Sequence, residues 1–260
     1  MTATAPLAFI TGASSGIGQA LAARYAQAGW RLALVARRTA DVRAWAAVQG
    51  LQAGRCEVYG ADVALPDSIV AAGSACIDSQ GLPDVVIASA GMSVGMDTAY
   101  RADLDVMRDL FALNNTGMAA TFHPFVQGMR KRRSGTLVGI ASVSAIRGLP
   151  GHGAYCGSKA AVVAYCESLR GELRPFGVNV VTLLPGYVAT PLTAKNPYAM
   201  PFQMSAERFA DSAFKAIAAG SSYSVIPWQM GVVAKLMRLL PNPLFDRVVA
   251  GRGRKPRREG

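Results

Sequence analysis

The 260-residue sequence has few cysteines, few histidines and no long apolar run. Its four cysteines form neither a CxxC pair nor a metal-ligand spacing, and only two histidines accompany them, so we expect reduced thiols and no metal site. They are Cys56, Cys76, Cys156 and Cys166. Because no run reaches about 18 apolar residues, we expect no transmembrane helix. The N-terminal segment MTATAPL does not fit a signal peptide, so we expect a cytoplasmic protein.

Acidic residues are also scarce, with 16 Asp and Glu against 27 Lys and Arg and a formal net charge of +11. Most of the excess lies in two short segments, Arg130 to Arg133 and 251–260, which each carry a net charge of +4. We expect both to be solvated and the protein to bind no nucleic acid, since no nucleic-acid-reading motif accompanies the charge. The basic residues of the tail are Arg252, Arg254, Lys255, Arg257 and Arg258, beside Glu259.

Short apolar, β-branched runs alternate with longer helical patterns along the chain. The runs are continuous rather than alternating in polarity, which is typical of parallel strands covered on both faces. The pattern predicts an α/β fold with a doubly wound, mostly parallel sheet in a single domain, 1–250, before the basic tail. The expected strands are Leu7 to Thr11, Leu32 to Ala36, Cys56 to Gly60, Asp84 to Ala88, Gly135 to Ile140 and Val178 to Leu184.

A glycine-rich loop, TGASSGIG from Thr11 to Gly18, follows the first expected strand and opens a helical run. Glycines at such a turn let the backbone approach a pyrophosphate, and the amides of the next helix face its charge. The spacing therefore predicts a Rossmann-type dinucleotide site. Its residues would be Gly12, Ser14, Ser15, Gly16, Ile17 and Gly18.

A second constellation lies near the fifth strand. Tyr155 and Lys159 are four residues apart in AYCGSKAAV, so both lie on one face of a helix, and Ser142 precedes the tyrosine by thirteen residues. A phenol with a pKa of about 10 is a poor proton shuttle at neutral pH. An ammonium about 4 Å away, at an effective dielectric constant near 20, contributes about 4 kcal/mol of phenolate stabilisation. Lys159 is therefore expected to lower the pKa of Tyr155.

Together these motifs resemble those of the short-chain dehydrogenase/reductase family, over about residues 5 to 225. The resemblance implies an oxidoreductase that transfers a hydride between a nicotinamide and a carbonyl or alcohol carbon. Tyr155 would be the general acid or base, Ser142 would hold the reacting oxygen, and Lys159 would bind the ribose. Asn114, in the run Leu113 to Gly117, matches the family asparagine that helps to hold a water chain.

The choice of cofactor can be argued from charge. No acidic residue lies between Ile17 and Ala40, so the second strand lacks the carboxylate that would bind the ribose 2′-hydroxyl of NAD. Arg37 and Arg38 follow that strand instead and suit a 2′-phosphate, so we expect NADP(H). The resemblance adds contacts near the adenine, the ribose and the nicotinamide. These are Asp62, Val63, Ala90, Gly91, Pro185, Gly186, Val188 and Thr190.

The substrate is expected to be an apolar carbonyl or alcohol compound. The segment 191–250 would supply its pocket, and several apolar residues there suit either a lining or lid, or ordinary packing of a helix on the sheet. These are Met200, Pro201, Phe202, Met204 and Phe209. His152, three residues before Tyr155, is a weaker candidate contact.

A second functional class, a non-catalytic NADP-binding sensor or scaffold, is compatible with the same fold. The combination of Ser142, Tyr155 and Lys159 favours the enzyme, because a sensor needs no proton donor.

The segment from Pro227 to Phe245 is unusually apolar and leads into the basic tail. This composition is that of an interfacial membrane anchor, but the segment is short for stable anchoring, so a pocket wall or a subunit contact is favoured. The family resemblance implies a homodimer or homotetramer associated through the fourth and fifth helices.

Overall fold

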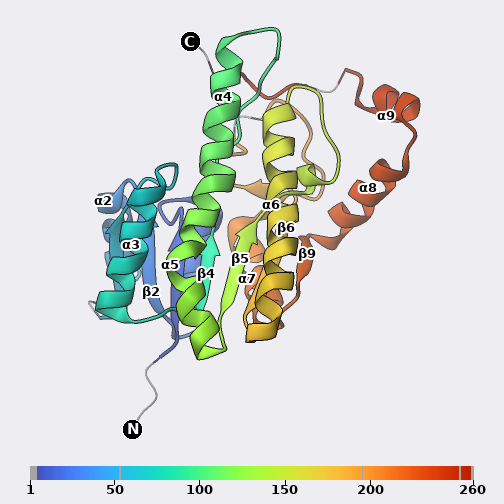
Figure 1. Cartoon of the computed structure of the whole chain (residues 1–260). Helices are drawn as coiled ribbons and strands as arrows, with labels where there is room; N and C mark the ends of the chain where they lie inside the picture. Colours follow the sequence, from blue (N-terminus) through green and yellow to red (C-terminus); the bar gives the residue numbers. More distant parts are fainter. Residues whose placement is uncertain (1–4, 53, 195, 252, 259–260) are drawn as a thin grey trace.

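The computed structural model describes residues 5–52, 54–194, 196–251 and 253–258. Within them, seven strands form one parallel sheet in the order β3-β2-β1-β4-β5-β6-β9 (Figure 1). The strands are β1 (Leu7–Thr11), β2 (Arg31–Ala36), β3 (Cys56–Gly60), β4 (Val85–Ala88), β5 (Thr136–Ile140), β6 (Asn179–Pro185) and β9 (Tyr223–Ile226), and a separate short pair comprises β7 (Val188–Ala189) and β8 (Met204–Ser205). The predicted doubly wound α/β sheet is confirmed.

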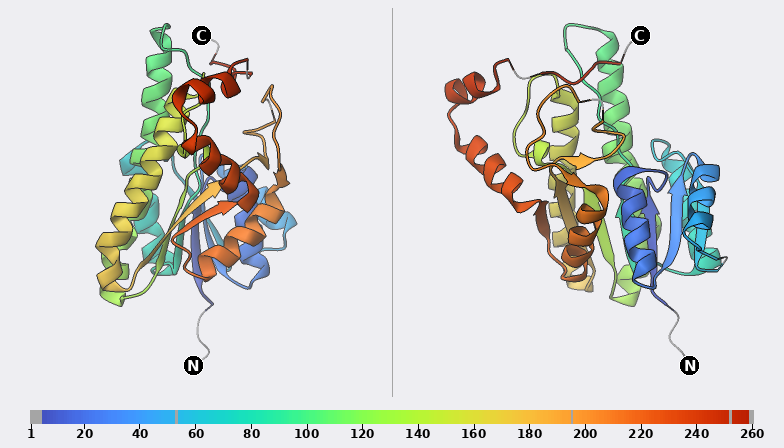
Figure 2. Two further views of the ribbon diagram at one scale, coloured as in Figure 1. Left: turned by 90° about the vertical axis from the view of Figure 1, so that its right-hand side faces the viewer. Right: turned by 180° about the vertical axis from the view of Figure 1, so that it is seen from behind.

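Helices cover both faces of the sheet. Figure 1 shows α3, α5 and α6 on one face, and the view from behind in Figure 2 shows α1 and α7 on the other. The helices are α1 (Gly16–Gln27), α2 (Thr39–Val48), α3 (Pro66–Gln80), α4 (Ala102–Phe111), α5 (Gly117–Arg132), α6 (Gly153–Leu173), α7 (Ala206–Ala218), α8 (Trp228–Leu239) and α9 (Asn242–Val249). The chain thus forms three layers, helix on sheet on helix.

The alternation of side chains along each strand explains the continuous apolar runs. In β1, Leu7 and Phe9 face the core beneath α3, α5 and α6, whereas Ala8 and Ile10 face the core beneath α1 and α7. All four side chains have no exposed surface. Both faces of such a strand must therefore be apolar.

The edge strand β9 lies outside the set of strands expected from the sequence. It is four residues long, its Tyr223 side chain is 46% exposed, and it pairs only with β6. A short edge strand with polar residues lacks the apolar run by which the central strands are recognised.

The order of the strands creates a switch point between β1 and β4. The chain moves outward from β1 to β3 and then returns to β4 on the other side of β1. Thr11, at the end of β1, fastens the two strands together, because its hydroxyl accepts hydrogen bonds from the amides of Ser89 and Ala90, both at 3.1 Å. In a sheet of this kind, ligands bind beyond the carboxyl ends of the strands at the switch point.

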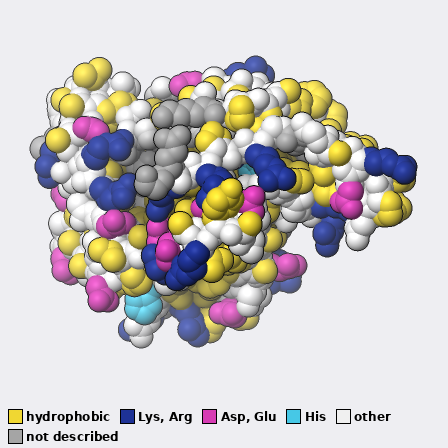
Figure 3. Space-filling model, turned by 90° about the horizontal axis from the view of Figure 1, so that it is seen from above, with side chains coloured by type: hydrophobic (Ala, Val, Ile, Leu, Met, Phe, Trp, Pro, Cys, Tyr) yellow, Lys and Arg dark blue, Asp and Glu magenta, His cyan; other side chains and the backbone are white. Residues whose placement is uncertain are grey.

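Helices α8 and α9 project from the sheet beyond β9 (Figures 1 and 3). Arg147 holds their junction, since its guanidinium donates to the carbonyl of Leu240 at 2.7 Å and lies 3.7 Å from the centre of the Phe245 ring. One side of α8 is apolar and exposed, with Leu236 at 60% and Leu239 at 79%. Among the described residues, no helix has both the length and the apolar character needed to cross a membrane.

The basic tail is docked where its residues are described. Arg257 forms two hydrogen bonds, at 2.6 and 3.0 Å, with the carboxylate of Asp103 at the start of α4, and Asp103 is only 1% exposed. These bonds hold the pKa of Asp103 below its ordinary value. The amide of Gly95 also donates to the carbonyl of Pro256 at 3.0 Å. Residues 253–258 are thus docked on the protein, although all of them except the half-buried Lys255 are exposed to solvent, as expected from the sequence; Arg252 and Glu259 lie outside the described residues.

The basic run at the end of α5 is likewise bonded, although it is exposed. Arg132 donates to the carbonyl of Pro83 at 2.7 Å and pairs with Asp84 at 3.4 Å. Arg133 donates to the carbonyl of Pro175 at 3.1 Å. The run is exposed, as expected of a solvated helix end, and these two arginines also join α5 to the segment before β4 and to the turn after α6.

Replacing Arg257 tests whether this ion pair holds the tail. In Arg257→Gln, the buried carboxylate of Asp103 loses its charged partner, and the tail is expected to detach. Hydrogen exchange of the Gly95 amide should then be at least about tenfold faster, because its acceptor lies on the tail. The matched control, Arg258→Gln, removes a tail cation that pairs with Asp109 at an exposed site, and it should change the exchange of Gly95 little. Equal exchange rates in the wild type and Arg257→Gln would contradict this account.

Candidate active site

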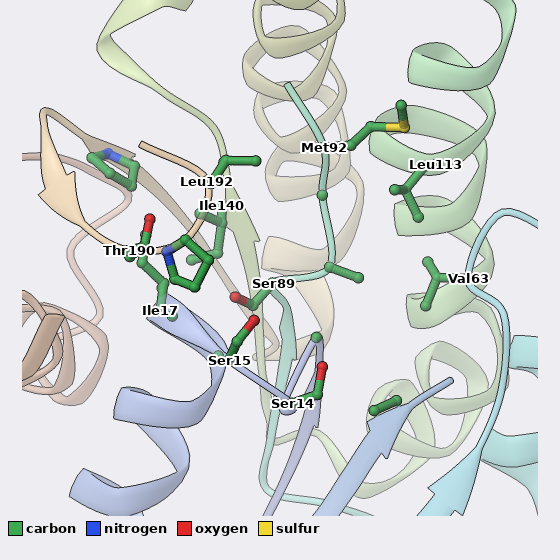
Figure 4. A pocket seen from close by; sticks show the side chains of 18 of the residues that line it. Ser14, Ser15, Ile17, Val63, Ser89, Met92, Leu113, Ile140, Thr190 and Leu192 are labelled. Atoms are coloured by element: carbon green, nitrogen blue, oxygen red, sulfur yellow. The ribbon is translucent and has the colours of Figure 1, made fainter. Parts of the chain in front are cut away.

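A cleft of about 460 Å³ lies at the carboxyl ends of the strands, at the switch point (Figure 4). Its walls are the segments that follow β1, β2, β3, β4, β5 and β6. All eighteen residues expected to contact the cofactor line it, together with Ser142. The lining residues without an assignment from the sequence include Val35, Ala61, Ser89, Met92, Ile140, Leu192 and Thr193.

The glycine loop requires its glycines for steric reasons. Gly12 has a φ of +70°, and a Cβ there would lie 2.9 Å from the Cα of Ala90. A Cβ on Gly18 would overlap the carbonyl of Gly12. Helix α1 begins within this loop, at Gly16, and the side chain of its N-cap residue, Ser15, makes no capping hydrogen bond. The first amides of α1 therefore face the cleft as donors for an anion.

Arg37 and Arg38 lie at the mouth of the cleft, after β2, and each has an acidic partner. The guanidinium of Arg37 lies 3.8 Å from the Asp62 carboxylate. Arg38 pairs with Asp41 at 2.6 Å and also donates to the hydroxyl of Ser14 at 3.4 Å. An anionic group near Ser14 would therefore meet the guanidinium of Arg38 already oriented by Asp41.

Tyr155, Lys159 and Ser142 meet on the other side of the cleft. Tyr155 and Lys159 lie one turn apart in α6, and Ser142 follows β5. The ammonium of Lys159 donates to the carbonyl of Ile140 at 2.8 Å, and the hydroxyl of Ser142 accepts from the amide of Ser144 at 3.1 Å. Ser142 and Tyr155 both line the cleft.

Asn114 lies behind the cleft wall rather than in it. It occupies a single π-helical turn, Ala112–Thr116, between α4 and α5. Its amide exchanges hydrogen bonds of 3.0 and 3.1 Å with the backbone of Met92 and donates to the hydroxyl of Ser158 at 3.0 Å. Such π-helical turns often occur at functional sites. Here the turn ties the loop after β4 to α6.

Burial dominates the electrostatics of this site. It raises the pKa of Tyr155 to about 12, against the opposing effect of the Ser142 hydroxyl. It also lowers the pKa of Lys159 to about 8. Lys159 is not among the groups that shift the pKa of Tyr155, so the expectation that this lysine lowers it is wrong for the protein groups alone, and desolvation raises it instead.

Comparisons with known proteins agree with this geometry. The family described as "short chain dehydrogenase" matches residues 6–200. An uncharacterized oxidoreductase from Myxococcus xanthus is 37% identical over 239 residues, covering 92% of this chain and 94% of that protein. The chain belongs to the short-chain dehydrogenase family.

Two solved structures share the fold. The short-chain dehydrogenase from Sphingobium yanoikuyae, in complex with NADPH, has a TM-score of 0.77 and 26% identity, covering 91% of this chain and 96% of its own. L-Sorbose reductase from Gluconobacter frateurii, in complex with NADPH and L-sorbose, has a TM-score of 0.77 and 25% identity, covering 86% and 95%.

The five apolar residues that the sequence suggested for the substrate pocket of this short-chain dehydrogenase lie outside both pockets near Tyr155. Phe209 is fully buried in the core between α7 and the sheet, and Phe202 is 52% exposed. A second pocket of about 60 Å³ adjoins Tyr155 and Ser142, and none of the five predicted apolar residues lines it or the main cleft. His152, the weaker candidate, does line the second pocket, and its ring lies 3.2 Å from the hydroxyl of Tyr198.

The buried ammonium of Lys159 has a measurable cost. Because its pKa falls from 10.5 to about 8 on folding, the unfolded chain binds more protons between these values, and this group's contribution to stability rises with pH there. At pH 7 the charge costs up to about 3 kcal/mol. We expect Lys159→Met to be more stable than the wild type at pH 7 by no more than this amount, with an advantage that shrinks toward pH 10.

Urea unfolding at pH 7, 8.5 and 10 measures this difference. The control, Lys215→Met, removes an exposed lysine of α7 and should show no such pH dependence. A Lys159→Met variant that is destabilised equally at all three pH values would contradict the assigned cost.

Proposed function

We propose that this short-chain dehydrogenase uses NADP(H) to transfer a hydride between the nicotinamide and a carbonyl or alcohol substrate, with Tyr155 as general acid or base. One observation carries the proposal: a single cleft combines the glycine loop and the α1 N-terminus with Ser142, Tyr155 and Lys159. The residues that would bind the cofactor and the residues that would carry out the proton transfer thus line the same cavity.

The residues present fit the cofactor. The loop from Gly12 to Gly18 and the first amides of α1 would hold the pyrophosphate, because the N-terminus of a helix binds anions. Gly12 and Gly18 keep the loop in its close-packed shape, since a side chain at either position would overlap the backbone. Arg37 and Arg38 would hold the 2′-phosphate through charge-assisted hydrogen bonds. By family resemblance, Asp62 and Val63 would flank the adenine, and the segment from Pro185 to Thr190 would border the nicotinamide.

In the reductive direction the bound cofactor supplies a hydride to the carbonyl carbon, and the protein must supply a proton to the oxygen. The raised pKa of Tyr155 keeps the proton on the phenol at neutral pH, as a proton donor requires. Ser142 would hold the carbonyl oxygen toward that phenol and stabilise the charge that develops there. The buried ammonium of Lys159 would stabilise the phenolate left after transfer, and solvent would return the proton.

The proposal extends to location and assembly. All four cysteines are free thiols, which supports the cytoplasm. Leu104 and Met107 on α4 are 44% and 40% exposed, which supports association through α4 and α5 into a homodimer or homotetramer.

Replacing Tyr155 tests the proton donor. Tyr155→Phe removes only the hydroxyl, so turnover of ketones with NADPH should fall by at least about 10³-fold while NADPH affinity changes little. Tyr165→Phe is the matched control, because it makes the same change on an exposed face of α6 and should retain activity. The assay is NADPH absorbance over a panel of linear and cyclic ketones. Retained turnover in Tyr155→Phe would overturn the assignment, and cofactor binding with no turnover by the wild type would favour the sensor.

Replacing Arg38 tests the choice of cofactor. Loss of one charge-assisted hydrogen bond to the 2′-phosphate is worth about 1.5 to 3 kcal/mol, so Arg38→Ser should weaken NADPH binding about 10- to 100-fold. NADH, which lacks that phosphate, should bind almost unchanged. Dissociation constants from nicotinamide fluorescence measure both, with the exposed Arg43→Ser of α2 as the control. A wild-type preference for NADH would contradict the account.

A further inference from the structure

The second pocket, next to Tyr155, has polar and apolar walls in similar measure, the apolar part including Val143, Leu149 and Leu192. It shares Ser142 and Tyr155 with the main cleft, so a molecule in it would lie against the proposed proton donor. Its other walls carry hydroxyl, amide and imidazole groups from the loops around it. They include Ser93, Ser144, His152, Thr193, Asn196 and Tyr198.

The tail contributes Lys255 to this pocket. The ammonium of Lys255 donates to the hydroxyl of Ser93 at 3.0 Å and to the carbonyl of Leu192 at 3.2 Å. The backbone on its C-terminal side is held by the bond from Gly95 to Pro256 and by the ion pair of Arg257 with Asp103. Lys255 is therefore presented to the pocket by a segment that is fastened at several points.

Lys255 differs from the other described basic residues of the tail. Arg254, Arg257 and Arg258 each lie within 3.7 Å of an aspartate carboxylate. The hydrogen bonds found for Lys255 within the described chain go to neutral oxygens, and none of the described residues lining the pocket is acidic. Burial lowers the pKa of Lys255 to about 8, so the fold holds this cation at a cost.

We propose that Lys255 binds a carboxylate of the substrate, and hence that the enzyme reduces short oxo acids or oxidises the corresponding hydroxy acids. The inference rests on the proposed function, because it assigns the substrate class of the same site. The carboxylate neutralises the ammonium and directs the carbonyl group of the same molecule toward Tyr155 and Ser142. The pocket's small volume, about 60 Å³, favours a molecule with few atoms between the two groups.

The hydroxyl, amide and imidazole groups of this pocket, taken without the charge of Lys255, would suit a neutral polyhydroxy ketone equally well. The ammonium distinguishes the two classes, because a half-buried cation with no carboxylate partner among the described residues gains most from an anionic ligand. Lys255 is thus a specificity-determining residue in the proposal, supplied by the tail rather than by the sheet.

Matched pairs of substrates test the inference. The probes are 3-oxobutanoate and 4-oxopentanoate, and the methyl esters of both, which keep the ketone but lack the charge. With the wild type and NADPH, kcat/KM should be higher for each acid than for its ester. Lys255→Met should lower kcat/KM for the acids about 10- to 100-fold, mainly through KM, and change the esters less than about threefold.

Two further variants separate charge from folding. Lys255→Arg keeps a cation at the same place and should retain a preference for the acids. Arg258→Gln removes a tail charge outside the pocket and should leave both substrate classes unchanged. Hydrogen exchange of the Gly95 amide shows whether the tail remains docked in each variant.

Each outcome decides the inference. A higher kcat/KM of the wild type for the esters or for neutral polyhydroxy ketones than for the acids would overturn it. So would an equal fall in kcat/KM for acids and esters in Lys255→Met, provided that the tail is still docked in this variant. If no carbonyl compound is reduced at all, the proposed function fails instead, and calorimetric binding of 4-oxopentanoate to the protein with NADP⁺ decides the role of Lys255. Binding that Lys255→Met abolishes supports the role, and absence of binding by the wild type refutes it.

Discussion

The common direction of the seven strands is the constraint on which the site depends. Because every strand of the main sheet is parallel to its neighbours, the residue that follows each strand emerges at the same edge. Gly12, Arg37, Gly91, Ser142 and Pro185 come from five different strands and yet line one cleft. The inner strands, such as β1 and β4, have both faces buried, so their register is fixed by two cores at once. The loops that line the cleft are therefore held in place by the strands that they follow.

Two lysines at the site, one fully buried and one partly buried, lower the stability of the folded protein. Lys159 comes from a helix of the central fold, and Lys255 comes from the end of the chain, yet burial lowers the pKa of both to about 8. Neither position would be chosen for stability, because a desolvated ammonium without a carboxylate opposes folding. Lys159 lines the main cleft and Lys255 lines the second pocket, both together with Tyr155, and these positions are explained if each lysine stabilises a negative charge during the reaction. Lys159 would face the phenolate, and Lys255 would face the substrate.

The fold and the cleft could largely be predicted from the sequence, because their signals are local. A continuous apolar run identifies a buried strand, most cofactor-binding residues lie within a few positions of a strand end, and Tyr155 and Lys159 are recognised by their spacing of four residues on a helix. The position of Lys255 could not be predicted, because it depends on Arg257 meeting Asp103 across 154 residues of sequence. The raised pKa of Tyr155 could not be predicted either. Its spacing from Lys159 indicates that the two side chains are close together, but it does not show how far burial desolvates the phenol. Phe209 has the composition of a pocket lining but packs in the core, where an apolar residue of an amphipathic helix is equally expected.

The central claim is that one cleft carries out direct hydride transfer with protonation by Tyr155. The most direct measurement uses NADPH deuterated at C4 of the nicotinamide, on one face at a time, with a ketone that the enzyme reduces. Mass spectrometry of the alcohol then locates the label. The account predicts deuterium on the carbinol carbon from one face only, with the hydroxyl proton taken from solvent. Label from both faces, or an alcohol whose carbinol hydrogen comes from solvent, would contradict it.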